Sequence, residues 1–198
     1  MTITSLLRVS ATALCAGALL AGCGSSSTPT PTTSGTAVPA TSSASPSSGG
    51  NPALSVALAP SDLPAGATGF TQVSDGLLGT TPRTDARVFA NSTNTTRLEV
   101  DLAVDTGTGA ATTDYTAYNA SASKQVATQS GTSTPSIGSQ ANEYVGTDTN
   151  GHSIVSLAFV QGTVICVVTM VSSSGTVDAT VGEAVAGNQA QKIIAANL

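Results

Sequence analysis

The sequence predicts an α+β fold in which an antiparallel β-sheet packs against two helices. Apolar and polar residues alternate over 97–104, as in a strand with one buried face. Two apolar, β-branched runs within 153–171 are typical of a hairpin of buried strands. Apolar residues recur every three or four positions over 111–126, which indicates an amphipathic helix. A second helix is expected over 177–197, at the end of the chain.

The N-terminal segment has the three parts of a secretory signal. Arg8 supplies the cation, an apolar stretch runs from Val9 to Leu19, and small residues precede Cys23. The apolar stretch is shorter than the roughly 20 residues that a helix needs to cross a bilayer. We therefore expect residues 1–22 to be a cleaved signal peptide rather than a permanent membrane anchor.

The last four residues of this segment, Leu20, Ala21, Gly22 and Cys23, resemble the lipobox of bacterial lipoproteins. The resemblance implies that diacylglycerol is attached to the Cys23 thiol and that cleavage precedes this cysteine, with no cofactor besides this covalent lipid. Two or three acyl chains attach a protein stably. The membrane is thus an expected partner, and the outer face of the plasma membrane, in the cell envelope, is the expected location. An ordinary secretory signal with a chance cysteine is the alternative.

Beyond Cys23 the chain reads as a tether followed by one domain. Residues 24–52 consist almost entirely of Ser, Thr, Pro, Gly and Ala without charge, a composition that cannot bury enough surface to order itself. About 29 such residues span about 30 Å as a flexible coil, or about 90 Å as polyproline II. We expect residues 23–52 to form the lipidated cysteine and a disordered tether, and 53–198 to form a single α+β envelope domain.

The first part of the domain predicts extended structure. Pro60 and Pro64 favour an extended arm or a strand over a helix in 54–63. Two strands are expected at 87–90 and 97–104, joined by a turn at 91–94. In the second strand one face is expected to be buried and the other to be wet.

The rest of the domain predicts a helix, a sheet and a closing helix. The apolar recurrence over 111–126 predicts a helix of about 18 residues, and a loop rich in Ser, Thr, Gly and Pro follows it to Gly138. A short strand is expected at 143–146. The hairpin within 153–171 turns at Gln161 and Gly162, and its strands do not alternate, which predicts central strands covered on both faces. Thr176 is the expected cap of the last helix.

The late hairpin, followed by a helix that ends Ala190-Gln191-Lys192-Ile193-Ile194, resembles the extracellular sensor domain of mycobacterial serine/threonine kinases and related actinobacterial lipoproteins. The resemblance covers about the last 90 residues and rests on layout. It implies an α+β sensor-like module, and a composition rich in Ala, Gly, Thr and Val also fits an actinobacterial source. Those sensor domains contain disulfides, whereas Cys166 is the one cysteine of this domain.

Charge excludes one class of partner. The chain has eleven Asp and Glu against six Lys and Arg, and the cations of the domain are scattered. A nucleic-acid binding protein needs a basic stripe that displaces phosphate counterions. We therefore expect no nucleic-acid partner.

The three cysteines have separate fates. Cys15 leaves with the signal, Cys23 takes the lipid, and Cys166 lies in an apolar run. A disulfide within the mature chain is therefore not expected. Burial of Cys166 in the core is favoured over a redox role, because an apolar environment raises a thiol pKa and hides the sulfur.

Candidate catalytic groups are few. His152 follows a turn and would need partners brought in by the fold, and an exposed turn histidine is the favoured interpretation. Glu99 and Asp101 project from the same face of one strand, which suits a hydrolytic pair but also any solvated strand. Fragments of a calcium loop occur at Asp101, Asp105 and Asp148, without the full ligand pattern, so no metal is expected.

These observations leave three hypotheses. The first is a non-catalytic binding or sensor-like module, not an enzyme, whose cleft between sheet and helices is floored by Tyr115 and Tyr118 and takes a small molecule, a lipid or an envelope protein. The second is an envelope hydrolase that uses Glu99, Asp101 or His152, which requires at least two of them in one concave pocket. The third is a wall spacer or surface antigen without a ligand, which predicts no pocket.

Overall fold

Seven strands form one antiparallel sheet in the computed structural model, which describes residues 50–76 and 83–198. The strands are β1 (Thr71–Gly76), β2 (Thr84–Ala90), β3 (Thr96–Val104), β4 (Thr128–Ser133), β5 (Gln140–Thr147), β6 (Ser153–Gln161) and β7 (Val164–Ser172). Three α-helices accompany them, α1 (Pro52–Val56), α2 (Thr108–Gln125) and α3 (Ala179–Ala196), with 3₁₀ turns η1 (Pro60–Asp62) and η2 (Ala65–Ala67) after α1. The predicted α+β fold class is confirmed.

The sheet joins two groups of consecutive strands. Its order is β1-β2-β3-β7-β6-β5-β4, so β1 to β3 form one half, β4 to β7 form the other, and β3 pairs with β7 at the joint. That pairing runs from Thr96 opposite Ser172 to Val104 opposite Val164. Segments about 60 to 76 residues apart in sequence therefore meet along the full length of both strands.

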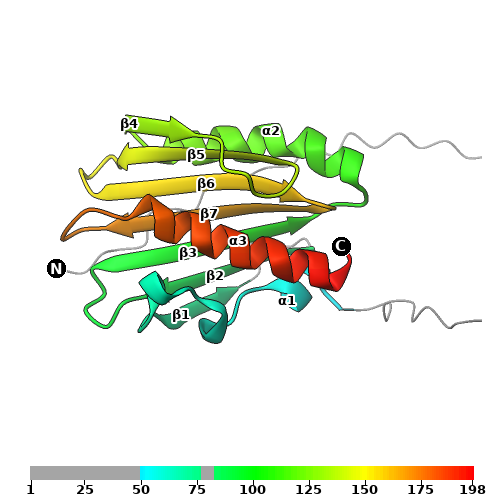
Figure 1. Ribbon diagram of the computed structural model, residues 1–198, viewed down its shortest axis with the longest axis horizontal. Helices are drawn as coiled ribbons and strands as arrows, with labels where there is room; N and C mark the ends of the chain where they lie inside the picture. The colour runs from blue at the N-terminus through cyan, green and yellow to red at the C-terminus, as the bar shows by residue number, and fades with distance from the viewer. Residues whose placement is uncertain (1–49, 77–82) are drawn as a thin grey trace, which may run out of the picture. The chain divides into compact units, whose positions relative to one another are not determined.

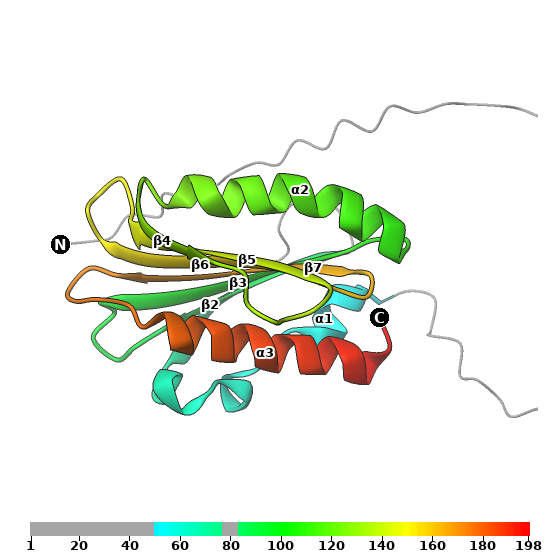
Figure 2. The ribbon, with the colours of Figure 1, turned by 45° about the horizontal axis from the view of Figure 1, so that its top comes forward.

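Helices cover both faces of the sheet. Figure 2 shows α2 above the sheet and α3 with α1 below it. α2 packs on β5, β6 and β7, whereas α3 crosses β6 and β7 on the opposite face and contacts α1 (Figure 1). The predicted central position of the strands in 153–171, with both faces covered, is confirmed, and it explains why their apolar residues do not alternate.

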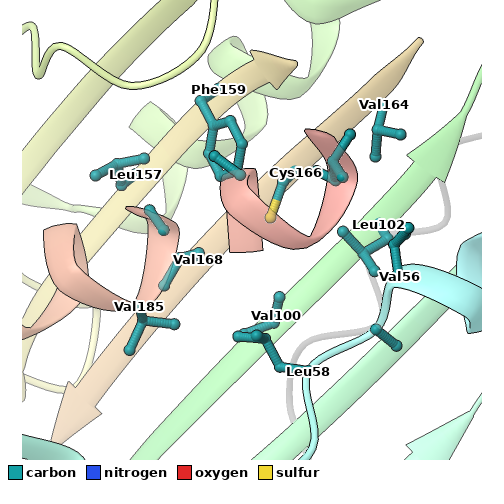
Figure 3. Packing of buried hydrophobic residues seen from close by; sticks show 14 of the residues in the cluster. Val56, Leu58, Val100, Leu102, Leu157, Phe159, Val164, Cys166, Val168 and Val185 are labelled. Carbon is teal, nitrogen blue, oxygen red and sulfur yellow. The ribbon is translucent and has the colours of Figure 1, made fainter. Parts of the chain in front are cut away.

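Two apolar clusters fill the two interfaces. The larger lies between the sheet and α3, and Figure 3 shows Val100 of β3, Val168 of β7 and Val185 of α3 meeting in it. Phe159 and Cys166 are fully buried in the same cluster. The smaller cluster lies under α2 and includes Tyr115 and Ile165. Burial of Cys166 in the core is thus confirmed.

The expected extended structure over 54–63 is wrong at its start. Asn51 accepts a hydrogen bond from the Ala53 N–H at 3.0 Å, and proline follows at the first helical position, so α1 is initiated there. The segment 56–62 is then held against α3 by two side-chain contacts. Gln189 donates to the Val56 carbonyl at 2.8 Å, and Lys192 pairs with Asp62 at 2.7 Å.

The two edge strands are further differences from the expected elements. β1 was not among the expected strands, and β4 occupies part of the expected loop that ends at Gly138. Every residue of β4 is exposed, so it carries no apolar alternation by which a strand is detected. β5 is longer than the short strand expected at 143–146.

The predicted helices and the predicted hairpin occur close to their expected positions. α2 has 18 residues, as expected. The hairpin turn falls at Gly162 and Thr163, one residue later than expected, because Gln161 pairs with Val164 and Gly162 adopts a positive φ of 60°. α3 is capped by Asp178, which accepts from the Thr180 N–H, so Thr176 is not the cap.

The expected signal peptide, the lipobox residues Leu20, Ala21 and Gly22, the lipidated Cys23 and the tether as far as residue 49 lie outside the described residues. They stay predictions. Within 50–76 and 83–198, no helix is long and apolar enough to cross a membrane.

The burial of Cys166 leads to a prediction about the reactivity of its thiol. Burial, together with the nearby Asp101 charge, raises the pKa of Cys166 well above its ordinary value. In the full chain carrying Cys15→Ser and Cys23→Ser, Cys166 should not react with a water-soluble disulfide reagent at pH 8 under native conditions. It should react completely in guanidinium. Rapid labelling of the native protein, measured by absorbance, would contradict the buried position.

Candidate functional site

A cavity of about 520 Å³ lies at one end of the sheet. It is surrounded by β4, the end of β5, the β5–β6 turn and the segment 173–177 that leads into α3. In Figure 1 this is the end at which the β5–β6 turn (yellow) and the segment before α3 (orange) meet. Three segments of the chain, 128–130, 145–153 and 172–177, therefore build one concave surface.

Hydroxyl groups dominate the lining. Seven lining residues carry one: Thr128, Ser130, Thr147, Ser153, Ser172, Ser173 and Thr176. Val145 and Val177 supply apolar surface, and Gly146, Gly151 and Gly175 bring backbone to the wall. His152 is the one lining residue, among those that the structure describes, with an ionisable side chain.

His152 is held by an aspartate in its own turn. Asp148 Oδ1 accepts from the backbone N–H groups of Asn150 and His152, each at 2.8 Å, and Asp148 Oδ2 lies 3.1 Å from His152 Nδ1. Gly151 completes the turn with a φ of 78°. Burial raises the pKa of Asp148, but these hydrogen bonds outweigh it and hold the pKa below its ordinary value.

The charged Asp148 orients the imidazole. A carboxylate at Nδ1 favours the tautomer in which Nδ1 carries the proton and Nε2 is an acceptor. Within the described residues Nε2 has no hydrogen-bond partner. The side chain of His152 is 29% exposed, so it is partly buried in the wall and still reaches solvent.

Other hydrogen bonds hold the cavity wall in place. Ser153 Oγ accepts from the Val177 N–H at 2.9 Å, and Thr96 donates to Ser172 Oγ at 3.2 Å. These bonds fix the segment before α3 against the strand ends. By contrast, the hydroxyls of Thr128, Thr147 and Thr176 have no partner among 50–76 and 83–198, which leaves them available to a ligand.

The β4 side of the cavity depends on a bulge and a glycine. The register of β4 against β5 shifts between Gln129 and Gly131, which makes Ser130 the extra residue. Gly146 lies opposite Gln129, and a Cβ there would collide with the Thr128 carbonyl oxygen. Bulges near sites redirect side chains, and this one is accompanied by Ser130 in the cavity wall.

Glu99 and Asp101 lie together elsewhere, on the face of β3 opposite the larger cluster. Asp101 pairs with Ala86 on one side and with Val167 on the other. Both carboxyl groups are partly buried, so the expectation of a fully wet strand face is wrong. Asp101 Oδ1 is buried without a hydrogen-bond partner among the described residues.

The pKa values of both carboxyl groups are raised. Burial, the Glu99 charge and a hydrogen bond to Glu99 raise the pKa of Asp101 well above its ordinary value, and burial also raises the pKa of Glu99. The charged form of Asp101 is therefore disfavoured in the folded protein. Neither residue lines the cavity at His152, so the candidate acid-base residues do not converge in that pocket.

The two tyrosines lie under α2. Tyr115 is buried, donates to the Ala158 carbonyl at 3.3 Å and accepts from Asn142 at 2.8 Å. Tyr118 is partly buried against the same cluster, and burial, with the charges of Asp105 and other carboxylates, raises its pKa. Neither tyrosine lines the cavity at His152.

The sequence identified His152 as a candidate but not the residues that surround it in the cavity. The available signal was Asp148, four residues before His152, with Asn150 and Gly151 between them as a turn. No comparable signal marked the threonines. No group of three or more His, Cys, Asp or Glu side chains within the described ranges is placed to hold a metal ion.

Comparison of the chain with protein-family models, with curated proteins and with solved structures finds no match. The likeness to kinase sensor domains therefore stays a prediction, and function has to be inferred from the site.

The raised pKa of Asp101 predicts a pH dependence of stability. Because the pKa of Asp101 is raised in the folded state, folding is most favoured below the ordinary aspartate pKa and loses stability as pH rises through the raised value. Asp101→Asn should remove this loss and increase the free energy of unfolding at pH 8 by on the order of 1 kcal/mol. Urea unfolding at pH 4 to 8 measures it.

Asp114→Asn, at an exposed position of α2, is the matched control and should leave the pH dependence of stability in place. Equal pH slopes for Asp101→Asn and the unmodified protein would show that Asp101 ionises normally.

Proposed function

We propose that the protein is a lipid-anchored lipoprotein of the cell envelope whose domain binds a ligand, without catalysis, in the cavity at His152. The cavity is the observation that carries the proposal. Its volume of about 520 Å³ falls within the range of roughly 300 to 1,000 Å³ typical of ligand sites. Three of its threonine hydroxyls and the Nε2 atom of His152 are free for a ligand among the described residues.

The position of the cavity suits a protein anchored through its N-terminus. The domain begins at Asn51, which donates to the carbonyl of Thr84 at the start of β2, opposite Ala103. The cavity lies at the other end of β3, where Thr96 meets Ser172. Those ends are separated by seven residue steps, or about 23 Å. The proposed tether would therefore join the domain at the end of β3 away from the cavity.

The geometry favours binding over hydrolysis. A serine hydrolase needs a hydroxyl within hydrogen-bond reach of its base. Among the described residues no serine hydroxyl bonds to His152, and Glu99 and Asp101 lie away from the cavity. A spacer without a ligand is disfavoured by the presence of the cavity itself.

Hydrolysis remains the second candidate because of one contact. The bond between Asp148 and His152 Nδ1 is the arrangement by which a carboxylate orients a catalytic imidazole. Ester turnover that is lost in His152→Gln would favour this candidate, and turnover unchanged by that substitution would exclude it.

The lipid anchor is tested at Cys23. Mass spectrometry of the protein extracted from its native membrane should find a chain that begins at Cys23 and carries the mass of two or three acyl chains. Cys23→Ser should abolish both the acylation and the cleavage, since serine lacks the thiol. An unacylated mature wild type, or identical processing of the variant, would refute the anchor.

The binding site is tested by filling it. Ser173→Trp places an indole in the cavity wall, whereas Ser174→Trp, one residue later, changes an exposed position outside the lining. Native mass spectrometry of envelope-extracted protein should find a small molecule on the wild type and on Ser174→Trp, but not on Ser173→Trp. A wild type without any bound molecule, or retention by Ser173→Trp, would contradict binding at this cavity.

A further inference from the structure

We infer that the cavity at His152 recognises a neutral polyhydroxylated ligand, a saccharide segment, rather than an anion or an acyl chain. This inference rests on the proposed function and names the ligand class of the same site. It is carried by what lines the cavity and by which of its groups are already engaged.

The lining offers uncharged groups that both donate and accept hydrogen bonds. A hydroxyl donates one hydrogen bond and accepts two, as a sugar hydroxyl does, so a hydroxyl-lined wall and a polyol satisfy each other without charge. Thr128, Thr147 and Thr176 reach this wall from β4, from β5 and from the segment before α3. They surround the cavity from separate elements and are free within the described chain. A ligand with hydroxyls on several sides fits that distribution.

An anion is disfavoured by the charges present. Sites for phosphate or carboxylate groups are typically built from Arg or Lys, and neither is among the lining residues. The imidazole of His152 is already paired with the Asp148 carboxylate, which would repel an anion.

An acyl chain is disfavoured by the scarcity of apolar surface. Among the lining residues only Val145 and Val177 have aliphatic side chains without a polar atom. A long hydrocarbon chain requires a continuous apolar wall, because each methylene left in water loses the free energy of burial. Two valines provide instead the small apolar patch against which the C–H face of a sugar ring can pack.

His152 supplies the directional contact. With Nδ1 bonded to Asp148, Nε2 is left as an acceptor on a side chain whose orientation is fixed from the other side. A sugar hydroxyl can donate to Nε2 while it accepts from a neighbouring threonine. The imidazole is thus a binding group, and Asp148 is a positioning residue.

The test is a titration of the full ¹⁵N-labelled chain in detergent micelles, followed by amide chemical shifts. The probes are maltotriose, chitotriose, inorganic phosphate and decanoate. At least one saccharide should shift the amides of Thr147, Gly151 and Gly175 saturably, whereas phosphate and decanoate should leave them in place. Thr176→Val, which removes one hydroxyl and keeps the shape, should weaken saccharide binding about three- to tenfold. Ser174→Ala, outside the lining, should not.

Each other outcome overturns the inference in a distinguishable way. Shifts caused by phosphate or decanoate alone would retain the cavity as a site and reject the saccharide class. Saccharide shifts that lie outside the cavity, or that persist unchanged in Thr176→Val, would reject recognition by these hydroxyls. No shift with any probe rejects the inference, and the co-purification experiment with Ser173→Trp then decides separately whether the proposed binding function fails as well.

Discussion

The pairing of β3 with β7 is the interaction on which the rest of the structure depends. It is the contact that makes one sheet from two groups of strands, and nine successive residue pairs maintain it. By placing β7 at the centre, it allows α2 and α3 to cover β6 and β7 from opposite faces. The same register brings Thr96 to Ser172 and so closes the strand ends beside the cavity.

Polar groups occur in two different environments on this sheet, on the α2 side of β3 and at the cavity. On the α2 side of β3, Glu99 and Asp101 are partly buried and have raised pKa values, an arrangement that makes the folded state less stable as pH rises. At the cavity the hydroxyl groups are neutral, and the carboxylate of Asp148 is bonded to N–H groups of Asn150 and His152. The buried carboxyl pair and the cavity are thus separate, so the pair affects the pH dependence of stability and not the site.

The fold was predictable from sequence wherever burial produces a recognisable pattern of apolar residues. The alternation over 97–104, the helical spacing over 111–126 and the apolar hairpin over 153–171 identified β3, α2, β6 and β7, because these elements are buried on one or both faces. β4 is polar and fully exposed, so no pattern distinguishes it from a loop. The cavity was not predictable, since its hydroxyls come from separated segments of a chain rich in Ser and Thr. His152 was singled out by its rarity, and the fold supplies its context.

The separation between Asn51 and the cavity follows from the same sheet. The arm at Asn51 is fixed at one end of β2, and the cavity opens at the opposite end. Both statements fail if the β3–β7 register is different. The most direct measurement is therefore a set of interstrand backbone NOEs in the ¹³C,¹⁵N-labelled protein. The account predicts NOEs that place Val100 opposite Val168 and Thr96 opposite Ser172. NOEs that pair β3 with another strand, or with β7 in a shifted register, would contradict it.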